Sequence, residues 1–276
     1  MNHRIFAGAS AAGLLLCAGV RFASATLITL SDSNSVARFK TQSQDGPVPG
    51  MNYWSIDGGN QLANQWFWYR IGETGPERSI DTLTPTAVHV GNAGFGGSNN
   101  QLSVDYAGDR FRLTLTCTLM GGSPGSGTAD ISEMIRIDNT SASPLAFHLF
   151  QYSDFDLNSL AAGDLVRIRG GNTAQQSKAL FFAQETVATP RPSHIQAALS
   201  PAIYTLLTDG AASILNDDPG PCSGAVEYTF QWDANIAPGG TFIIATDKRI
   251  EGVPEPASLA ALAIASAFCL MSRRRR

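Results

Sequence analysis

The chain has 276 residues and a formal net charge of −4, with 43% hydrophobic and only 15% charged residues. Six of its 19 basic residues are arginines near the two ends, so residues 26–252 hold 13 basic and 22 acidic side chains, a balance of −9. Phosphate binding needs clustered Lys and Arg, so this composition excludes a body that binds nucleic acid. It also argues against a protein that crosses a membrane many times.

The first 25 residues have the layout of a secretory signal peptide. Arg4 supplies the positive start, residues 5–20 form an apolar run rich in Ala, Leu and Gly, and residues 23–25 are Ala-Ser-Ala. Signal peptidase accepts small residues at this spacing, so we expect the exported chain to begin near Thr26. One alternative is a buried helix of the mature fold. Another is a lipoprotein anchored through Cys17, against which Leu16 argues.

The C-terminal end combines a proline-rich motif, an apolar run and a basic cluster. The motif is Val253, Pro254, Glu255 and Pro256, residues 258–271 carry no charge, and the chain ends in Arg273, Arg274, Arg275 and Arg276. A transmembrane helix needs roughly 20 apolar residues, and snorkelling arginines with local bilayer thinning can make up the shortfall. Positive flanks stay in the cytoplasm, so this stop-transfer cluster would place the body outside the cytoplasmic membrane.

This order of motif, span and basic end resembles the PEP-CTERM sorting signal of Gram-negative bacteria that produce exopolysaccharide. The resemblance implies that a membrane-embedded exosortase recognises Pro254, Glu255 and Pro256 and processes the chain during export. Prolines suit such a motif because they fix φ and keep the segment extended. The alternative is an ordinary C-terminal anchor. Residues 65–70 and 150–156 also resemble the bodies of uncharacterised PEP-CTERM proteins, which implies no activity.

Alternation of apolar and polar side chains dominates the body and predicts β-strands. Residues 110–119 place Phe, Leu and Cys on one face and Arg and Thr on the other, and residues 226–233 alternate in the same way. A helical stretch is expected only around 195–208, where Pro201 interrupts it. Further strands are expected at 26–31, 51–57, 65–71, 86–91, 101–106, 129–138, 145–153, 165–170, 179–187 and 241–247.

Many strands and few helices predict an all-β fold. The expected fold class is an antiparallel β-sandwich with an N-terminal signal peptide and a C-terminal single transmembrane sorting tail. The expected units are the signal peptide at 1–25, the β-sandwich body at 26–250 and the sorting tail at 251–276. The sequence has no repeat of fixed period, which argues against a propeller or a solenoid.

Two cysteines remain in the exported body, Cys117 and Cys222. In an oxidising compartment they are candidates for a disulfide. Closing a loop of about a hundred residues could stabilise the fold by roughly 4 kcal/mol. The alternative is a plain buried thiol, because Cys117 lies on the apolar face of its predicted strand.

Residues 121–125 match the hydrolase pattern Gly-x-Ser-x-Gly, and acidic residues and His194 follow in hydrolase order. In that fold the oxyanion hole uses the N–H of the residue after the serine, and Pro124 has none. We therefore predict a hairpin loop at this site and no catalytic residues.

Two other groups of side chains could bind a ligand. Asp154 and Asp156 would share one strand face, an arrangement that suits Ca²⁺ or glycoside hydrolysis, with a solvated strand end as the alternative. Trp54, Trp66 and Trp68 could form an exposed platform for sugars or could fill the core.

Other signs of metal or cofactor chemistry are weak. The histidines of the body, His89, His148 and His194, stand far apart in the sequence without ligand spacing, so we predict no metal site. No phosphate loop or dinucleotide fingerprint is present, so no cofactor is expected.

Together these patterns predict a non-enzymatic, exported surface or extracellular-matrix protein. Its expected partners are signal peptidase, an exosortase, the cytoplasmic membrane through the tail, and exopolysaccharide. The alternative is a carbohydrate-binding module that uses the Trp54, Trp66 and Trp68 aromatics. A third hypothesis, a secreted hydrolase, would need a cleft that joins Asp154 or Asp156 to another carboxylate or a histidine.

Overall fold

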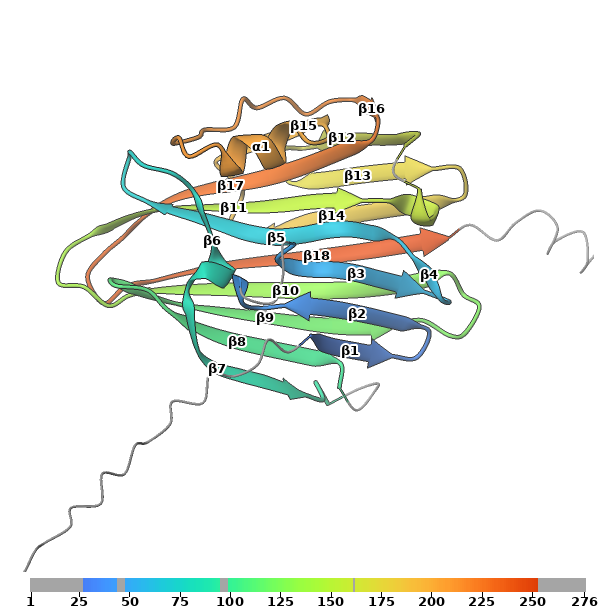
Figure 1. The fold of residues 1–276 in the computed structure, drawn as a ribbon, viewed down its shortest axis with the longest axis horizontal. Coiled ribbons are helices and arrows are strands. Elements are labelled where there is room, and N and C mark those ends of the chain that lie inside the picture. The colour runs from blue at the N-terminus through green and yellow to red at the C-terminus, as the bar shows by residue number, and fades with distance from the viewer. Residues whose placement is uncertain (1–26, 44–47, 95–98, 161, 253–276) are drawn as a thin grey trace, which may run out of the picture.

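The structure is a computed structural model that describes residues 27–43, 48–94, 99–160 and 162–252. These residues form two antiparallel β-sheets with a single α-helix (Figure 1). In sheet A the strand order is β1 (Ile28–Asp32), β2 (Ser35–Lys40), β3 (Gly50–Ile56), β5 (Leu62–Ile71), β11 (Leu145–Phe155), β17 (Val226–Ile236) and β15 (His194–Leu199). Two short strands pair with it, β4 (Gly59–Asn60) on β3 and β6 (Arg78–Ser79) on β5.

Sheet B lies against sheet A and contains the longer hairpins. Its strand order is β16 (Cys222–Gly224), β12 (Asp164–Arg169), β13 (Thr173–Lys178), β14 (Phe181–Thr189), β18 (Thr241–Gly252), β10 (Thr128–Asn139), β9 (Phe111–Gly121), β8 (Gln101–Ala107) and β7 (Thr84–Gly91). The remaining elements are α1 (Ala202–Thr208) and the 3₁₀ turns η2 (Ile80–Thr82) and η3 (Leu157–Ser159).

The predicted alternation on sheet B has a clear physical cause. On β9 the apolar side chains Phe111, Leu113, Leu115, Cys117 and Leu119 are buried, whereas the residues between them are mostly part-exposed. One face of the sheet meets sheet A and the other meets solvent, so a period of two satisfies both.

The central strands of sheet A are buried on both faces. Every residue from Val226 to Trp232 on β17 is buried, and β5 and β11 are nearly as enclosed. Helix α1 and the segment 209–221 cover the outer face, where Tyr204 packs edge-on against Trp68 and the Leu215 N–H donates to Gln231 Oε1.

Several predicted elements need correction. Residues 194–199 of the expected helical stretch form strand β15, and the helix begins only after Pro201, at Ala202. Strands β2 and β13 were not expected. The body also runs beyond 250, because Glu251 and Gly252 continue β18 by pairing with Thr128 on β10 and with β14.

The fold class predicted from the sequence needs correction, because it included a single transmembrane segment that none of the described residues forms; residues 258–271, predicted to form it, lie outside the described ranges. Within the described ranges, no helix has the length and apolar character that crossing a membrane requires. The predicted signal peptide at 1–25, the motif at 253–256 and the basic cluster at 273–276 lie outside the described residues. What is described is a mostly β protein of two antiparallel sheets.

Gly121 ends β9 where the backbone of β1 comes closest. Its N–H donates to Asp32 Oδ2 at 2.8 Å, and a Cβ added there would lie 1.9 Å from the Asp32 carbonyl oxygen. We expect Gly121→Ala to lower the free energy of unfolding by about 1–3 kcal/mol, as overpacking does. Gly91→Ala is the control, since open space surrounds Gly91. Urea unfolding of both variants checks this, and equal stabilities would contradict the close approach.

Candidate functional site

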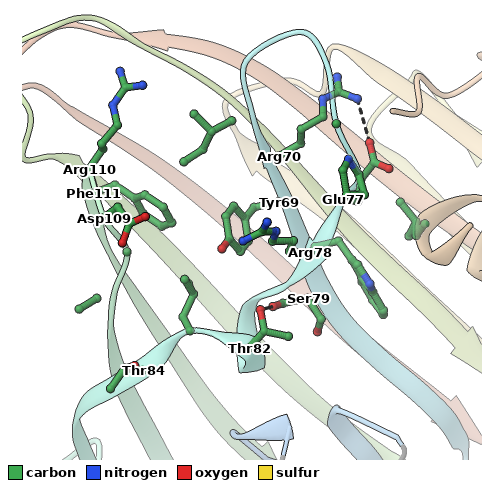
Figure 2. A pocket seen from close by; sticks show the side chains of 18 of the residues that line it. Tyr69, Arg70, Glu77, Arg78, Ser79, Thr82, Thr84, Asp109, Arg110 and Phe111 are labelled. Atoms are coloured by element: carbon green, nitrogen blue, oxygen red, sulfur yellow. Dashed lines mark hydrogen bonds and ion pairs between the residues drawn. The ribbon is translucent and has the colours of Figure 1, made fainter. Parts of the chain in front are cut away.

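A cavity of about 1000 Å³ opens where the chain passes from sheet A to sheet B (Figure 2). Its walls come from β5, from the segment 74–84 that carries β6 and η2, from the β8–β9 turn at 107–111 and from the end of α1. Its lining residues therefore come from four separate parts of the chain.

Aromatic rings form the inner part of this cavity. The rings of Tyr69 and Phe111 meet edge-on at 5.3 Å, and Tyr69 stacks on Phe147 at 5.8 Å. Burial raises the pKa of the Tyr69 hydroxyl, while Arg78 and Thr82 act in the opposite direction. The hydroxyl therefore stays protonated at neutral pH and can donate a hydrogen bond.

One wall is fixed by a buried ion pair. Arg70 Nη1 lies 2.8 Å from Glu77 Oε1, and both side chains are almost fully buried. The same nitrogen donates to the Ser213 carbonyl at 3.0 Å, and the Ser213 N–H donates to Glu77 Oε1 at 2.8 Å. These bonds tie the segment after β5 to the segment after α1 through Glu77 Oε1, while the buried Glu77 Oε2 has no hydrogen-bond partner in the described structure.

The rim of the cavity carries exposed charges. Arg78, Asp109 and Arg110 are exposed, and Figure 2 shows Arg78 beside Tyr69 with Asp109 and Arg110 across the opening. Within the described residues neither arginine forms a salt bridge, although Arg110 donates to the Pro144 carbonyl at 3.2 Å. The rim thus has a net positive charge on an acidic body, which suits a polar ligand with an anionic group.

The proposed tryptophan platform does not form. Trp54 and Trp66 are fully buried and Trp68 is 2% exposed. The indole N–H of Trp54 donates to Ser35 Oγ at 3.0 Å, and that of Trp66 donates to Asp81 Oδ1 at 3.2 Å. A carbohydrate-binding surface built on these three rings is therefore wrong, because their faces pack against protein.

The candidate disulfide is also absent. Cys117 and Cys222 are both free. Cys117 lies on β9 and Cys222 on β16, six strand positions apart in sheet B. At about 4.8 Å per strand this is a separation of roughly 29 Å, far beyond the reach of a disulfide.

Asp154 and Asp156 do not share the strand face that the sequence predicted, although Asp156 is near enough to help raise the pKa of Asp154. Strand β11 ends at Phe155 with a register shift after Asp154, so the predicted alternation stops there. Asp154 lies below α1, where the Tyr152 hydroxyl donates to Glu227 Oε2 at 2.8 Å and its oxygen lies 3.3 Å from Asp154 Oδ2. No group of three or more His, Cys, Asp or Glu side chains in the described part of the chain could hold a metal ion.

Two histidines that stand far apart in the sequence meet on sheet A. His148 Nδ1 lies 2.6 Å from Asp233 Oδ1, and His194 Nε2 lies 3.5 Å from Asp233 Oδ2. Strand β17 lies between β11 and β15, which brings both rings to one carboxylate. The sequence did not reveal this contact because the order of strands in the sheet cannot be read from spacing.

The Gly-x-Ser-x-Gly segment is the hairpin loop that the sequence predicted. It joins β9 to β10, and the Ser126 N–H donates to the Ser123 carbonyl at 2.9 Å. The Asp57 carboxylate accepts from the N–H groups of Gly125 and Gly127 at 2.6 and 2.8 Å. Burial acts to raise the pKa of Asp57, but these bonds and one from Asn34 together outweigh it and lower that pKa, and they give the loop a structural role.

A group of charged side chains lies between the sheets and was not predicted. This core charge cluster consists of Glu133 on β10, Lys248 on β18 and Glu185 on β14, all fully buried. Burial raises the pKa of Glu133. Burial would lower the pKa of Lys248, but Glu133 and Glu185 outweigh it and hold that pKa above its usual value.

Comparisons with known proteins identify a fold and no family. No protein-family model and no curated protein matches the sequence. A bacterial glucoamylase complexed with acarbose is similar in structure, with a TM-score of 0.56 and 7% identity over 88% of this chain and 36% of the enzyme. A putative kojibiose phosphorylase from the human microbiome matches with a TM-score of 0.47, 9% identity, and coverage of 86% of this chain and 32% of that one.

The chain thus spans about a third of the length of these structures. At such low identity the glucoamylase match shows a shared two-sheet fold alone. The predicted β-sandwich therefore needs a further correction in its relationships, because the similarity to part of a glucoamylase structure was not predicted from the sequence.

The site below α1 gives a pH-dependent prediction. Burial, with Asp156 and Glu227 nearby, raises the pKa of Asp154 to about 7. From about pH 4 to pH 7 the unfolded chain loses this proton while the folded chain keeps it, so the free energy of unfolding falls as the pH rises. We expect Asp154→Asn to reduce that fall, measured by urea unfolding across this range.

The variant should keep part of the decline in stability, and an exposed carboxylate provides a control. Burial also raises the pKa of Glu227, so part of the decline remains in the variant. Asp109→Asn, which changes an exposed carboxylate, is the matched control and keeps the wild-type slope. Identical slopes for wild type and Asp154→Asn would contradict the burial of this carboxyl group.

Proposed function

We propose that the chain is a non-enzymatic, exosortase-processed protein of the cell surface or extracellular matrix, with a structural or adhesive body. The observation that carries the proposal is the position of the predicted processing segments relative to the strands. Strand β1 begins at Ile28, two residues after the expected mature start, and β18 ends at Gly252, directly before the motif at 253–256. Cleavage at either segment would leave every strand of both sheets intact.

The place of β18 in sheet B supports a load-bearing role. It has 12 residues and pairs along most of its length with β10 on one side and β14 on the other. A force applied at the tail would act along the strand and would have to shear both ladders of hydrogen bonds. An interior strand is therefore a suitable attachment point for a protein held at a surface.

Processing is tested by expressing the full chain in a PEP-CTERM-bearing host with and without its exosortase. We expect the intact mass of the exported protein to show loss of the segment after the Pro-Glu-Pro region only when the exosortase is present. Glu255→Ala with Pro254→Ala and Pro256→Ala should block that loss. An unchanged C-terminus in both hosts would reduce the tail to a plain anchor.

We also propose the cavity beside Tyr69 as the point of contact with matrix polysaccharide. A cavity with a polar, net-positive rim is suited to a saccharide that carries carboxylates. The glucoamylase of similar fold is, by its name, an enzyme that acts on carbohydrate. A saccharide is therefore the first ligand to test.

Titration calorimetry with uronate-containing and neutral oligosaccharides tests this contact. We expect binding of the acidic oligosaccharide, and Arg78→Ala should weaken it about tenfold or more, because one charge-assisted hydrogen bond contributes roughly 1.5–3 kcal/mol. Arg167→Ala on β12 is the control, since it removes the same charge from an exposed strand position outside the cavity. No binding, or equal loss in both variants, would refute the site.

A further inference from the structure

The core charge cluster places an amine between two carboxyl groups in a site without solvent access. Lys248 lies on β18, opposite Glu185 on β14, and Glu133 lies on β10 at the other side of the same strand. The Lys248 Nζ contacts Glu133 Oε2 and lies 3.3 Å from Glu185 Oε1. All three side chains are fully buried.

The two oxygens of Glu133 have very different surroundings. Hydrogen-bond donors converge on Oε2, with Gln151 Nε2 at 3.0 Å and both Gln65 Nε2 and Thr246 Oγ1 at 3.4 Å. Oε1 is buried and has no hydrogen-bond partner in the described structure. Donors gathered on one carboxyl oxygen form the arrangement that stabilises an oxyanion during acyl transfer.

Glu185 is held in place by the opposite sheet. Its Oε2 accepts from Tyr228 OH at 2.8 Å and from Ser153 Oγ at 3.1 Å, while Oε1 faces Lys248 and also accepts from Gln151 Nε2. Four donors therefore fix this carboxylate beside the amine. It is suited to accept a proton from Nζ and return it.

We propose that Lys248 and Glu133 become joined by an intramolecular isopeptide bond between Nζ and Cδ. Glu133 reacts in its acid form, with the proton on Oε1, and Lys248 gives one ammonium proton to Glu185 Oε1 at 3.3 Å to become a neutral amine. The amine then attacks Cδ, the C–N bond forms, and negative charge develops on Oε2 among its donors. Glu185 passes its proton to Oε1, the C–O bond breaks and one water molecule leaves, and Glu185 then takes the second proton from the nitrogen.

The core favours this condensation on physical grounds. The ammonium of Lys248 and the carboxylate of Glu185 cost several kcal/mol each in desolvation, and forming the amide while Glu185 takes up the released proton removes both charges. Burial raises the pKa of Glu133, which favours the acid form that the attack requires. The product would link β10 to β18 covalently, and β18 is the strand that leads to the proposed sorting motif.

Intact mass spectrometry of the folded, purified full-length chain under denaturing conditions tests the proposal. We expect a mass lower by one water molecule than the sequence of the recovered chain requires, and a branched peptide that joins Lys248 to Glu133 after proteolysis. Lys178→Arg is the matched control and keeps this loss. Lys248→Arg and Glu185→Gln should both show the full sequence mass.

A further variant separates this chemistry from other losses of water. Glu133→Gln still offers a carbonyl carbon to Lys248, but its leaving group is ammonia, so any mass loss should be that of ammonia. The intact mass of the wild-type chain tests the proposal even if a variant fails to fold. A folded wild-type chain at its full sequence mass, without the branched peptide, would overturn the proposal.

Discussion

The two sheets are held in one relative position by a buried polar cluster that draws its hydrogen-bond partners from both sheets. Lys248 and its partners Glu133 and Glu185 belong to sheet B, but, apart from the Thr246 hydroxyl, the amide and hydroxyl groups that complete their hydrogen bonds come from sheet A. An apolar interface between sheets tolerates small shifts, whereas a buried ion that loses its partner costs several kcal/mol. Burial of this cluster therefore fixes both the register of the sheets and the identity of the side chains around it.

The segments that cover sheet A determine which other side chains are buried and where the cavity lies. Its central strands are buried on both faces because α1 and the segment 209–221 close the outer side. This cover buries Trp68 below Tyr204, and Asp154 lies under it with a raised pKa. The cavity beside Tyr69 forms where the cover ends and the chain passes to sheet B. The cavity and its exposed, charged rim therefore lie at the boundary between the two sheets.

The sequence predicted those parts of the fold in which one face of a strand meets solvent. The alternation at 110–119 located β9, whereas β13, with the polar sequence Thr-Ala-Gln-Gln-Ser-Lys, gave no such signal. The alternation at 226–233 also located β17, but it did not show that both faces of this strand are buried. One sign of the core charge cluster is present in the sequence, because Glu133 lies at the same alternate positions as Ile131 and Ile135 and so shares their buried strand face. No pattern in the sequence predicted that His148 and His194 lie close together, because their proximity depends on the order of strands in the sheet. The burial of the tryptophans depends in the same way on segments that fold over sheet A.

Antibodies raised against residues 27–252 and applied to intact cells of an exosortase-bearing host would test the central claim most directly. The account predicts that they label the cell surface and the surrounding matrix without permeabilisation, and that the chain they capture is shorter than 276 residues at both ends. Labelling that appears only after lysis, with a full-length chain in the cytoplasmic fraction, would contradict export and remove the basis for a surface role.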